Sequence, residues 1–142
     1  MKVKDIMTKD VITVTHKTSL KELVSILKEK RIHGVPVVDE DGVLVGVITL
    51  TDMLKILQRI VYWEDIEQLK PGIGIKDALV RQKEDTSVGK NMTTSVNTVT
   101  EDESVEKVLE LMCRHNIHTI PVVKENKLVG VIGATDIVEL FI

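Results

Sequence analysis

The chain has 142 residues, a net charge of −3 and 43% apolar residues, with so few aromatics (2%) that a folded core must be aliphatic. The acidic balance and the lack of any block of Lys and Arg argue against a nucleic-acid partner. The single cysteine, Cys113, excludes an internal disulfide and no apolar run is as long as a membrane span, so the sequence predicts a cytoplasmic protein without a membrane partner.

The first predicted elements are a short strand and a helix. Residues 11–14 form a β-branched run that predicts a strand. Thr18 or Ser19 is expected to be the N-cap of a helix, and Glu22, three residues after Ser19, would complete a capping box. The residues that follow predict a helix with one buried stripe, formed by Leu20, Leu23, Val24 and Leu27.

A hairpin and a second helix come next. The continuous apolar runs 35–38 and 43–50 predict strands that are buried on both faces, and the polar residues 39–42 predict the turn between them. A helix is expected from Thr51 onward, and Pro71 would end it. The first half of the chain is therefore predicted to fold as a β-α-β-β-α unit.

The second half repeats the first. A shift of 85 residues aligns Met7-Thr8 with Met92-Thr93, and a shift of 84, after one deletion in the turn, aligns Gly46 with Gly130. The predicted elements are strands at 96–99, 120–123 and 128–132 and helices at 104–116 and 135–142. The side chains expected to point inward from the first of these helices are Val105, Val108, Leu109 and Met112. The predicted domains are residues 1–70 and 88–142, joined by a linker at 71–87.

The predicted fold class is α/β of the α+β type. Strands as apolar as these require helices on the faces of their sheets. The two β-α-β-β-α units are expected to pack sheet to sheet with pseudo-twofold symmetry, because two units are too few for an extended repeat array.

No catalytic or metal-binding motif occurs in the sequence, which predicts that the protein is not an enzyme and holds no metal. There is no zinc-type Cys/His spacing, no GxxxxGK[ST] phosphate loop and no GxSxG nucleophile motif. Cys113 is expected to be a packed thiol among apolar neighbours. The candidate chemistry is therefore that of binding.

The strand-to-helix junction at residues 46–52 is the strongest candidate binding site. Thr49 ends the strand and Asp52 begins the helix, so a hydroxyl, a carboxylate and free helix amides lie together. The carboxylate suits the two vicinal hydroxyls of a ribose, and the amides suit a phosphate. The alternative is that Thr51 or Asp52 only caps the helix, which contributes about 1 kcal/mol.

The two copies differ at this junction. Copy two keeps Thr135 and Asp136 but has Gly133 in place of the threonine hydroxyl. Capping requires only the residues that both copies keep, whereas a full ligand site requires the one that differs. His33 and His118 recur at matching positions before a proline, so each is either a structural histidine or part of a shared cleft.

Three motifs carry a family resemblance. MT-x-x-V-x-T-V, H-x-h-P-V-V (h, apolar) and L-V-G-V-I-x-x-T-D occur in this order in both halves of the chain. Each half resembles the cystathionine β-synthase (CBS) domain, and the two together resemble a tandem CBS pair, or Bateman module. The resemblance covers residues from about 3 to 57 and from about 88 to 141.

The resemblance implies two clefts between the units, in which many family members bind AMP, ADP or ATP and others bind S-adenosylmethionine. At the first cleft it implies phosphate and ribose roles for Thr49 and Asp52. The other residues implied there are His33, Gly34, Thr93, Asn97, Ile117, His118 and Thr119. The residues implied at the second, less complete cleft are Thr8, Ile12, Gly133 and Asp136.

The sequence therefore predicts a stand-alone regulatory module that requires no cofactor, binds an adenosine nucleotide and signals to a partner protein. The resemblance also implies a homodimer formed through the helices, with apolar residues of 53–61 and 137–142 in the interface. Two alternatives remain open: a protein-interaction or assembly module without a small-molecule ligand, and a module that binds S-adenosylmethionine.

Overall fold

The computed structural model describes residues 1–68 and 87–142, with side chains up to residue 60 in the first range and throughout the second. The N-terminal elements are α1 (Val3–Ile6), α2 (Leu20–Lys30), β1 (Gly34–Val38), β2 (Leu44–Thr49) and α3 (Leu50–Gln68). The C-terminal elements are α5 (Val88–Asn91), α6 (Val105–His115), β3 (Thr119–Lys124), β4 (Lys127–Gly133), α7 (Ala134–Val138) and the 3-10 helix η1 (Glu139–Phe141). The predicted linker lies outside the described residues, apart from Ser87.

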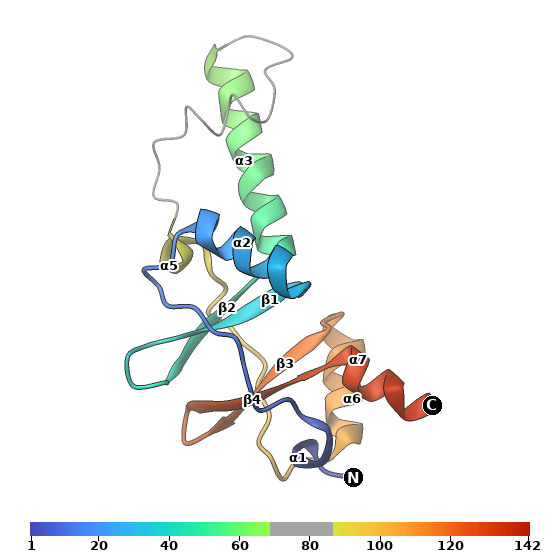
Figure 1. The fold of residues 1–142 in the computed structure, drawn as a ribbon. Helices are drawn as coiled ribbons and strands as arrows, with labels where there is room; N and C mark the ends of the chain where they lie inside the picture. Colours follow the sequence, from blue (N-terminus) through green and yellow to red (C-terminus); the bar gives the residue numbers. More distant parts are fainter. Residues whose placement is uncertain (69–86) are drawn as a thin grey trace.

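Each half of the chain is built on an antiparallel hairpin, which confirms the predicted hairpins and the α+β class. β1 pairs with β2 and β3 pairs with β4. α2 and α3 lie on the outer side of the first hairpin, and α6 and α7 on that of the second (Figure 1). We call residues 10–68 unit 1 and residues 95–142 unit 2. Each has its own aliphatic core, centred on Leu23 in unit 1 and on Val108 in unit 2.

The strands predicted at residues 11–14 and 96–99 are wrong. Only Val14 and Val99 reach a sheet, each through a single parallel bridge, to Val37 and Val122 respectively. In unit 1 the pairing ends at Val14 because a turn follows directly, in which the Thr18 amide donates to the Thr15 carbonyl (3.1 Å). The β-branched run therefore contacts the edge of the sheet only through its last residue, Val14.

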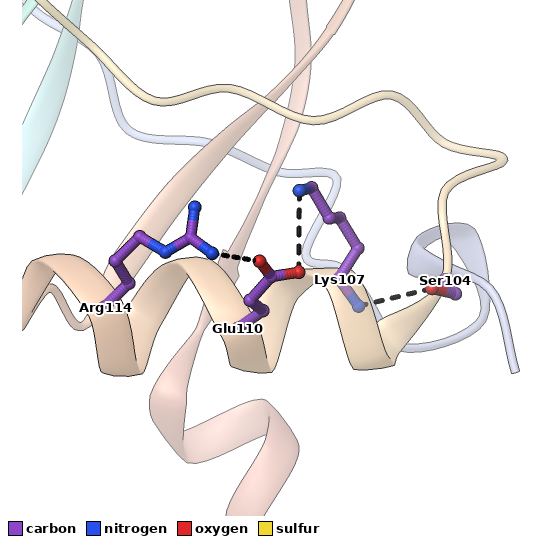
Figure 2. Close-up of polar contacts among 4 residues, drawn as sticks. All are labelled: Ser104, Lys107, Glu110 and Arg114. Carbon is purple, nitrogen blue, oxygen red and sulfur yellow. Dashed lines mark hydrogen bonds and ion pairs between the residues drawn. The ribbon is translucent and has the colours of Figure 1, made fainter.

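The predicted starts of α2 and α6 are confirmed, with Ser19 and not Thr18 as the N-cap of α2 and, within the described residues, with no return bond from the Glu22 side chain. Ser19 Oγ accepts the Glu22 amide (3.1 Å) at the start of α2, and Ser104 Oγ accepts the Lys107 amide (3.2 Å) at the start of α6. Figure 2 shows the second of these caps, together with Glu110, which lies between Lys107 and Arg114 and pairs with both.

The predicted inward stripes are wrong at one equivalent position in each unit. Val24 on α2 is 46% exposed and Leu109 on α6 is 43% exposed, although Leu23, Leu27 and Val108 beside them are buried. A two-stranded hairpin is narrower than the stripe that the sequence shows, so one apolar residue of each helix is left at its flank.

The two short helices cross between the units and were not predicted. Val3 of α1 is fully buried in the core of unit 2, where its amide donates to the Glu103 carbonyl (2.9 Å). Val88 of α5 is fully buried in the core of unit 1, where its amide donates to the Thr18 carbonyl (2.8 Å). Figure 1 shows α1 beside α6 and α5 beside α2. We call residues 1–9 and 87–94 the crossing segments.

The contacts between the units repeat with pseudo-twofold symmetry, as predicted. Thr8 of the first crossing segment pairs with Val131 of β4, and Thr93 of the second pairs with Val47 of β2. These pairs match under the repeat. A further bridge joins Val43 to Lys127, which are each other's counterparts, so the symmetry axis passes between the two hairpin turns. The hairpins therefore meet sheet to sheet.

We expect Ser19→Ala to lower the free energy of unfolding by about 1 kcal/mol, because the Glu22 amide would lose its only described side-chain acceptor. Ser25→Ala on the same helix is the control, since Ser25 only donates to the Lys21 carbonyl inside the helix (3.3 Å) and Ala is the better helix former. Urea unfolding measures both. Equal losses in the two variants would contradict the capping role.

Candidate functional site

The start of α3 is closed by a reciprocal capping box. The Asp52 amide donates to Thr49 Oγ1 (3.3 Å), and the Thr49 amide donates to Asp52 Oδ2 (2.9 Å). The Thr49 hydroxyl also donates to Asp52 Oδ2 (3.2 Å). Asp52 therefore caps the helix, and its partner in the cap is Thr49 and not Thr51. A threonine at the strand end and an aspartate three residues later are both needed for this cap.

A crossing segment completes the junction from outside unit 1. Thr93 Oγ1 donates to the second carboxylate oxygen of Asp52, Oδ1 (3.0 Å). The segment is held there because the Val47 amide donates to the Thr93 carbonyl (2.9 Å) and the Thr93 amide donates to the Val47 carbonyl (2.8 Å). One half-buried carboxylate thus joins two segments that lie 41 residues apart in sequence.

Gly46 permits this close approach, a role that the motifs had not predicted. A Cβ at residue 46 would lie 2.8 Å from the Thr93 carbonyl oxygen and 2.8 Å from Met92 Sδ. Gly130 stands at the matching place, where a Cβ would lie 2.8 Å from the Thr8 carbonyl oxygen. The signal was present in the sequence, because both copies carry this glycine in the middle of an apolar strand.

We expect Gly46→Ala to lower the free energy of unfolding by about 1–3 kcal/mol, because the added methyl group displaces the backbone of a crossing segment. Gly133→Ala is the matched control, since the nearest atom to its Cβ would be 3.5 Å away, an ordinary contact. Urea unfolding of the two variants gives the comparison. A stable Gly46→Ala protein would mean that the crossing segment moves away without cost.

His33 and Gly34 lie beside the junction through their backbone. Gly34 pairs with Thr49 in the hairpin, and the Leu50 amide donates to the His33 carbonyl (2.9 Å). His33 also lines a cavity of about 310 Å³ on the α2 side of unit 1, to which Asp52 does not contribute. The full lining of this cavity is Val24, Leu27, Lys28, Arg31, Ile32, His33 and Leu50.

The equivalent junction of unit 2 is less complete. The Gly133 amide donates to Asp136 Oδ2 (2.7 Å), which is half of a capping box. The other half is missing, because Gly133 has no hydroxyl that could accept a hydrogen bond from the Asp136 amide. His118 and Thr119 lie at this junction, because the Ala134 amide donates to the His118 carbonyl (2.8 Å) and Thr119 pairs with Gly133. In the parts of the chain that the structure describes, no hydrogen bond links these two residues to Asp52.

The remaining predicted residues are more scattered. Thr8 pairs with Val131 through backbone hydrogen bonds of 2.8 and 2.9 Å and so occupies the place that Thr93 has in unit 1. Ile12 packs against the core of unit 1, Asn97 is half-buried and Ile117 packs against the core of unit 2. The structure therefore brings together Thr49, Asp52, Thr93 and the His33-Gly34 backbone.

The described residues, 1–68 and 87–142, do not meet the requirements of a metal site, a membrane span or a packed thiol. Within them, no three His, Cys, Asp or Glu side chains are grouped as a metal site would need. No described helix combines the length and the apolar character that crossing a membrane requires. Cys113 is exposed, so its prediction as a packed thiol is wrong; the flank of α6 on which it lies does not face the hairpin.

Comparison with known proteins gives a family and relatives. The family model of the CBS domain matches residues 3–59 and 86–142. The chain is 34% identical over 140 residues to L-aspartate semialdehyde sulfurtransferase of Methanocaldococcus jannaschii. This alignment covers 98% of this chain but only 23% of that enzyme. It is 30% identical over 137 residues to the uncharacterized protein YlbB of Bacillus subtilis, which covers 96% of this chain and 79% of that protein.

Two solved structures show the same fold. The CBS domain pair of protein MJ0100, in complex with 5′-methylthioadenosine and S-adenosyl-L-methionine, has a TM-score of 0.73 and 34% identity, over 99% of this chain and 95% of that one. CBSX2 in complex with AMP has a TM-score of 0.77 and 26% identity, over 99% of this chain and 95% of that one. Both neighbours carry ligands that contain adenosine.

Proposed function

Since the chain belongs to the CBS domain family, as a tandem pair of these domains, we propose that it is a regulatory module that binds an adenosine nucleotide at the Asp52 junction. The observation that carries the proposal is the Asp52 carboxylate, which meets donors from both unit 1 and a crossing segment. A ligand bound at this carboxylate would contact both segments at once. The AMP complex of CBSX2 supports the ligand class.

The chemistry of the junction suits a nucleoside monophosphate. Asp52 would accept hydrogen bonds from the two ribose hydroxyls, in place of the Thr93 hydroxyl that it accepts now. The Thr49 hydroxyl and the first amides of α3, a helix of 19 residues, would meet the phosphate at the positive end of the helix dipole. Gly34 offers no cationic side chain that could neutralise the charge of further phosphates, so a single phosphate fits this site better than three do.

The signal would pass through a crossing segment. A ligand that takes the Asp52 oxygen releases Thr93 and so shifts the balance between two arrangements of residues 87–94. These residues also carry Val88, which is buried in the core of unit 1. Ligand binding at the site would therefore change the packing between the units. A partner protein or a second copy of the chain that contacts both units would respond to this change.

A homodimer belongs to the same proposal. Its support is the pair of apolar side chains that the two units leave exposed at equivalent positions, Val24 and Leu109. The domain boundaries at residues 70 and 88 and the regulated partner protein are likewise proposed.

Calorimetric titration of the full chain with AMP, ADP, ATP and S-adenosylmethionine tests the function. We expect AMP to bind most tightly and to raise the melting temperature in proportion to the logarithm of its concentration. S-adenosylmethionine as the tightest ligand would change the ligand and keep the class. No heat and no thermal shift with any of the four would overturn the proposal.

The second candidate function is an assembly module without a ligand. It is favoured by the fact that both Asp52 oxygens already accept hydrogen bonds from the protein, on Oδ1 from Thr93 and on Oδ2 from Thr49. The same titration decides between the two, because an assembly module would show no thermal shift with any adenosine ligand.

A further inference from the structure

The cavity on the α2 side of unit 1 is separate from the Asp52 junction. Its lining residues come from α2, from the turn after it and from the start of α3, and they include neither the carboxylate nor the hydroxyls of the junction. Leu27 is buried and Ile32 is half-buried, so these two form its inner surface, whereas Val24 and Leu50 at its sides are partly exposed. The cavity is therefore an aliphatic recess that opens to solvent.

Cations line this cavity and no acid does. Lys28 and Arg31 lie three residues apart at the end of α2, so their side chains leave the helix on the same side, and His33 follows them. In the part of the chain that the structure describes, neither Lys28 nor Arg31 takes part in an ion pair or a side-chain hydrogen bond. Two positive charges are therefore available beside the aliphatic recess.

The sequence repeat shows that the fold does not require these two cations. Unit 2 has Cys113 and Asn116 in their places, whereas the apolar lining residues are matched by apolar ones. Arg31 and Asn116 both end their helix with a left-handed backbone, at φ 54° and φ 52°. Asn adopts this conformation more readily than Arg does. The helix end therefore gives no reason for an arginine, and the cavity beside it does.

We propose that this cavity is a second ligand site of the chain and binds a small organic anion with an apolar body and one carboxylate. Arg31 would hold the carboxylate through two parallel hydrogen bonds, with Lys28 as the second cation beside it. The apolar body would lie against the aliphatic lining. The inference goes beyond the proposed function and depends neither on nucleotide binding at Asp52 nor on the homodimer.

The volume of the cavity limits the size of this ligand. At about 310 Å³ the cavity lies near the lower end of the range for small-molecule pockets, which is about 300–1,000 Å³. If each non-hydrogen atom takes about 30 Å³, as a molecule does in liquid water, the cavity holds about ten such atoms. Octanoate has about this size and is therefore the probe.

The lining favours a carboxylate with an apolar body over a free phosphate. Val24, Leu27, Ile32 and Leu50 are aliphatic and cannot pair with the oxygens of an anion. A phosphate carries polar oxygens on every side, so some of them would lose their water against this surface without a partner. Octanoate has its charge at one end only, which can face the two cations. Inorganic phosphate is therefore the second probe.

Calorimetric titration of the full chain with octanoate, below the concentration at which it forms micelles, tests the site. We expect Lys28→Gln with Arg31→Asn to weaken octanoate binding at least about tenfold, because charge-assisted hydrogen bonds are lost. Lys21→Gln with Lys30→Gln is the matched control, since it removes two charges from α2 outside the cavity and should change the affinity less than about twofold. Circular dichroism confirms that each variant is folded.

The other probes decide which part of the ligand is recognised. Octanol and octylammonium should bind at least about tenfold more weakly than octanoate, because they offer no anion to the two cations. An equal affinity for octanol would show an apolar recess without charge recognition and would overturn the inference. Binding of inorganic phosphate without binding of octanoate would overturn it as well.

AMP and the protein concentration separate this site from the two other proposals. Saturating AMP should not displace octanoate, and Lys28→Gln with Arg31→Asn should leave AMP affinity unchanged. Displacement by AMP would make the cavity part of the nucleotide site, which overturns the inference. An octanoate affinity that falls as the protein concentration rises would show that a second copy fills the cavity, which also overturns it. Binding of octanoate by a chain that binds no adenosine ligand would support this inference and overturn only the proposed function.

Discussion

Asp52→Asn is expected to weaken AMP binding by roughly 100-fold or more. A charged carboxylate that accepts from two ribose hydroxyls contributes about 1.5–3 kcal/mol per hydrogen bond, and the amide keeps one neutral oxygen in its place. Asn has nearly the same shape as Asp and still accepts the Thr49 amide, so the start of α3 should remain capped. Calorimetric titration at constant ionic strength gives the dissociation constants.

Asp136→Asn is the matched control for this experiment. Asp136 holds the same place in unit 2 but faces Gly133, which has no hydroxyl to offer a phosphate. We expect AMP affinity to change less than about threefold in this variant, a loss well below that of one charged hydrogen bond. The reverse result, with normal affinity in Asp52→Asn and weak binding in Asp136→Asn, would move the site to unit 2.

Val3→Asp is expected to destabilise unit 2 by about 4 kcal/mol or more, although residue 3 lies at the start of the chain. Val3 is fully buried among Val108, Ile120 and Ile132. A carboxylate in this position would have no described partner, and an unpaired buried charge costs about 3–5 kcal/mol. Met1→Asp, two residues away at a side chain that is 64% exposed, is the control and should have little effect.

Hydrogen exchange followed by mass spectrometry locates the damage. In Val3→Asp, peptides that contain β3 and β4 should lose protection first, while those that contain β1 and β2 retain it. Early loss of protection in β1 and β2 instead would show that residue 3 stabilises its own unit, which contradicts the crossing arrangement.

The elements that sequence patterns predicted well are those with local causes. The two hairpins were predictable because continuous apolar runs flank polar turns, and the starts of α2 and α6 because Ser19 and Ser104 accept an amide three residues later. The run at residues 11–14 was misjudged because β propensity does not reveal the turn that follows it.

The crossing segments were not predictable in the same way. α1 and α5 have four residues each, too few to show a helical period, and Val3 and Val88 are buried by contacts with the opposite unit. Residues buried by a distant part of the chain leave no local pattern. The family resemblance alone placed Thr93 beside Asp52, and the structure brings the two together.

The candidate site was predictable in part. Thr49 and Asp52 meet as their spacing suggested, because a strand end and a helix start are three residues apart. Val24 on α2 and Leu109 and Cys113 on α6 were predicted to be buried but are exposed. Apolar periodicity identifies one face of a helix but does not show which other element covers that face. The cavity that His33 lines is formed mainly by residues of α2 and of the turn after it, which no spacing of residues encodes.

The exchange of the crossing segments has a consequence for how such a chain could have arisen. A gene for one repeat alone, with one crossing segment and the unit that follows it, would make a protein in which the valine of the crossing segment does not fill the core of its own unit, as Val3 and Val88 do not here. Two such proteins would complete each other by trading their first residues, as in a domain-swapped dimer. Fusion of the two genes would then turn an encounter between molecules into a contact within one molecule, at a far higher effective concentration. The duplicated sequence is in this sense a dimer written as one polypeptide.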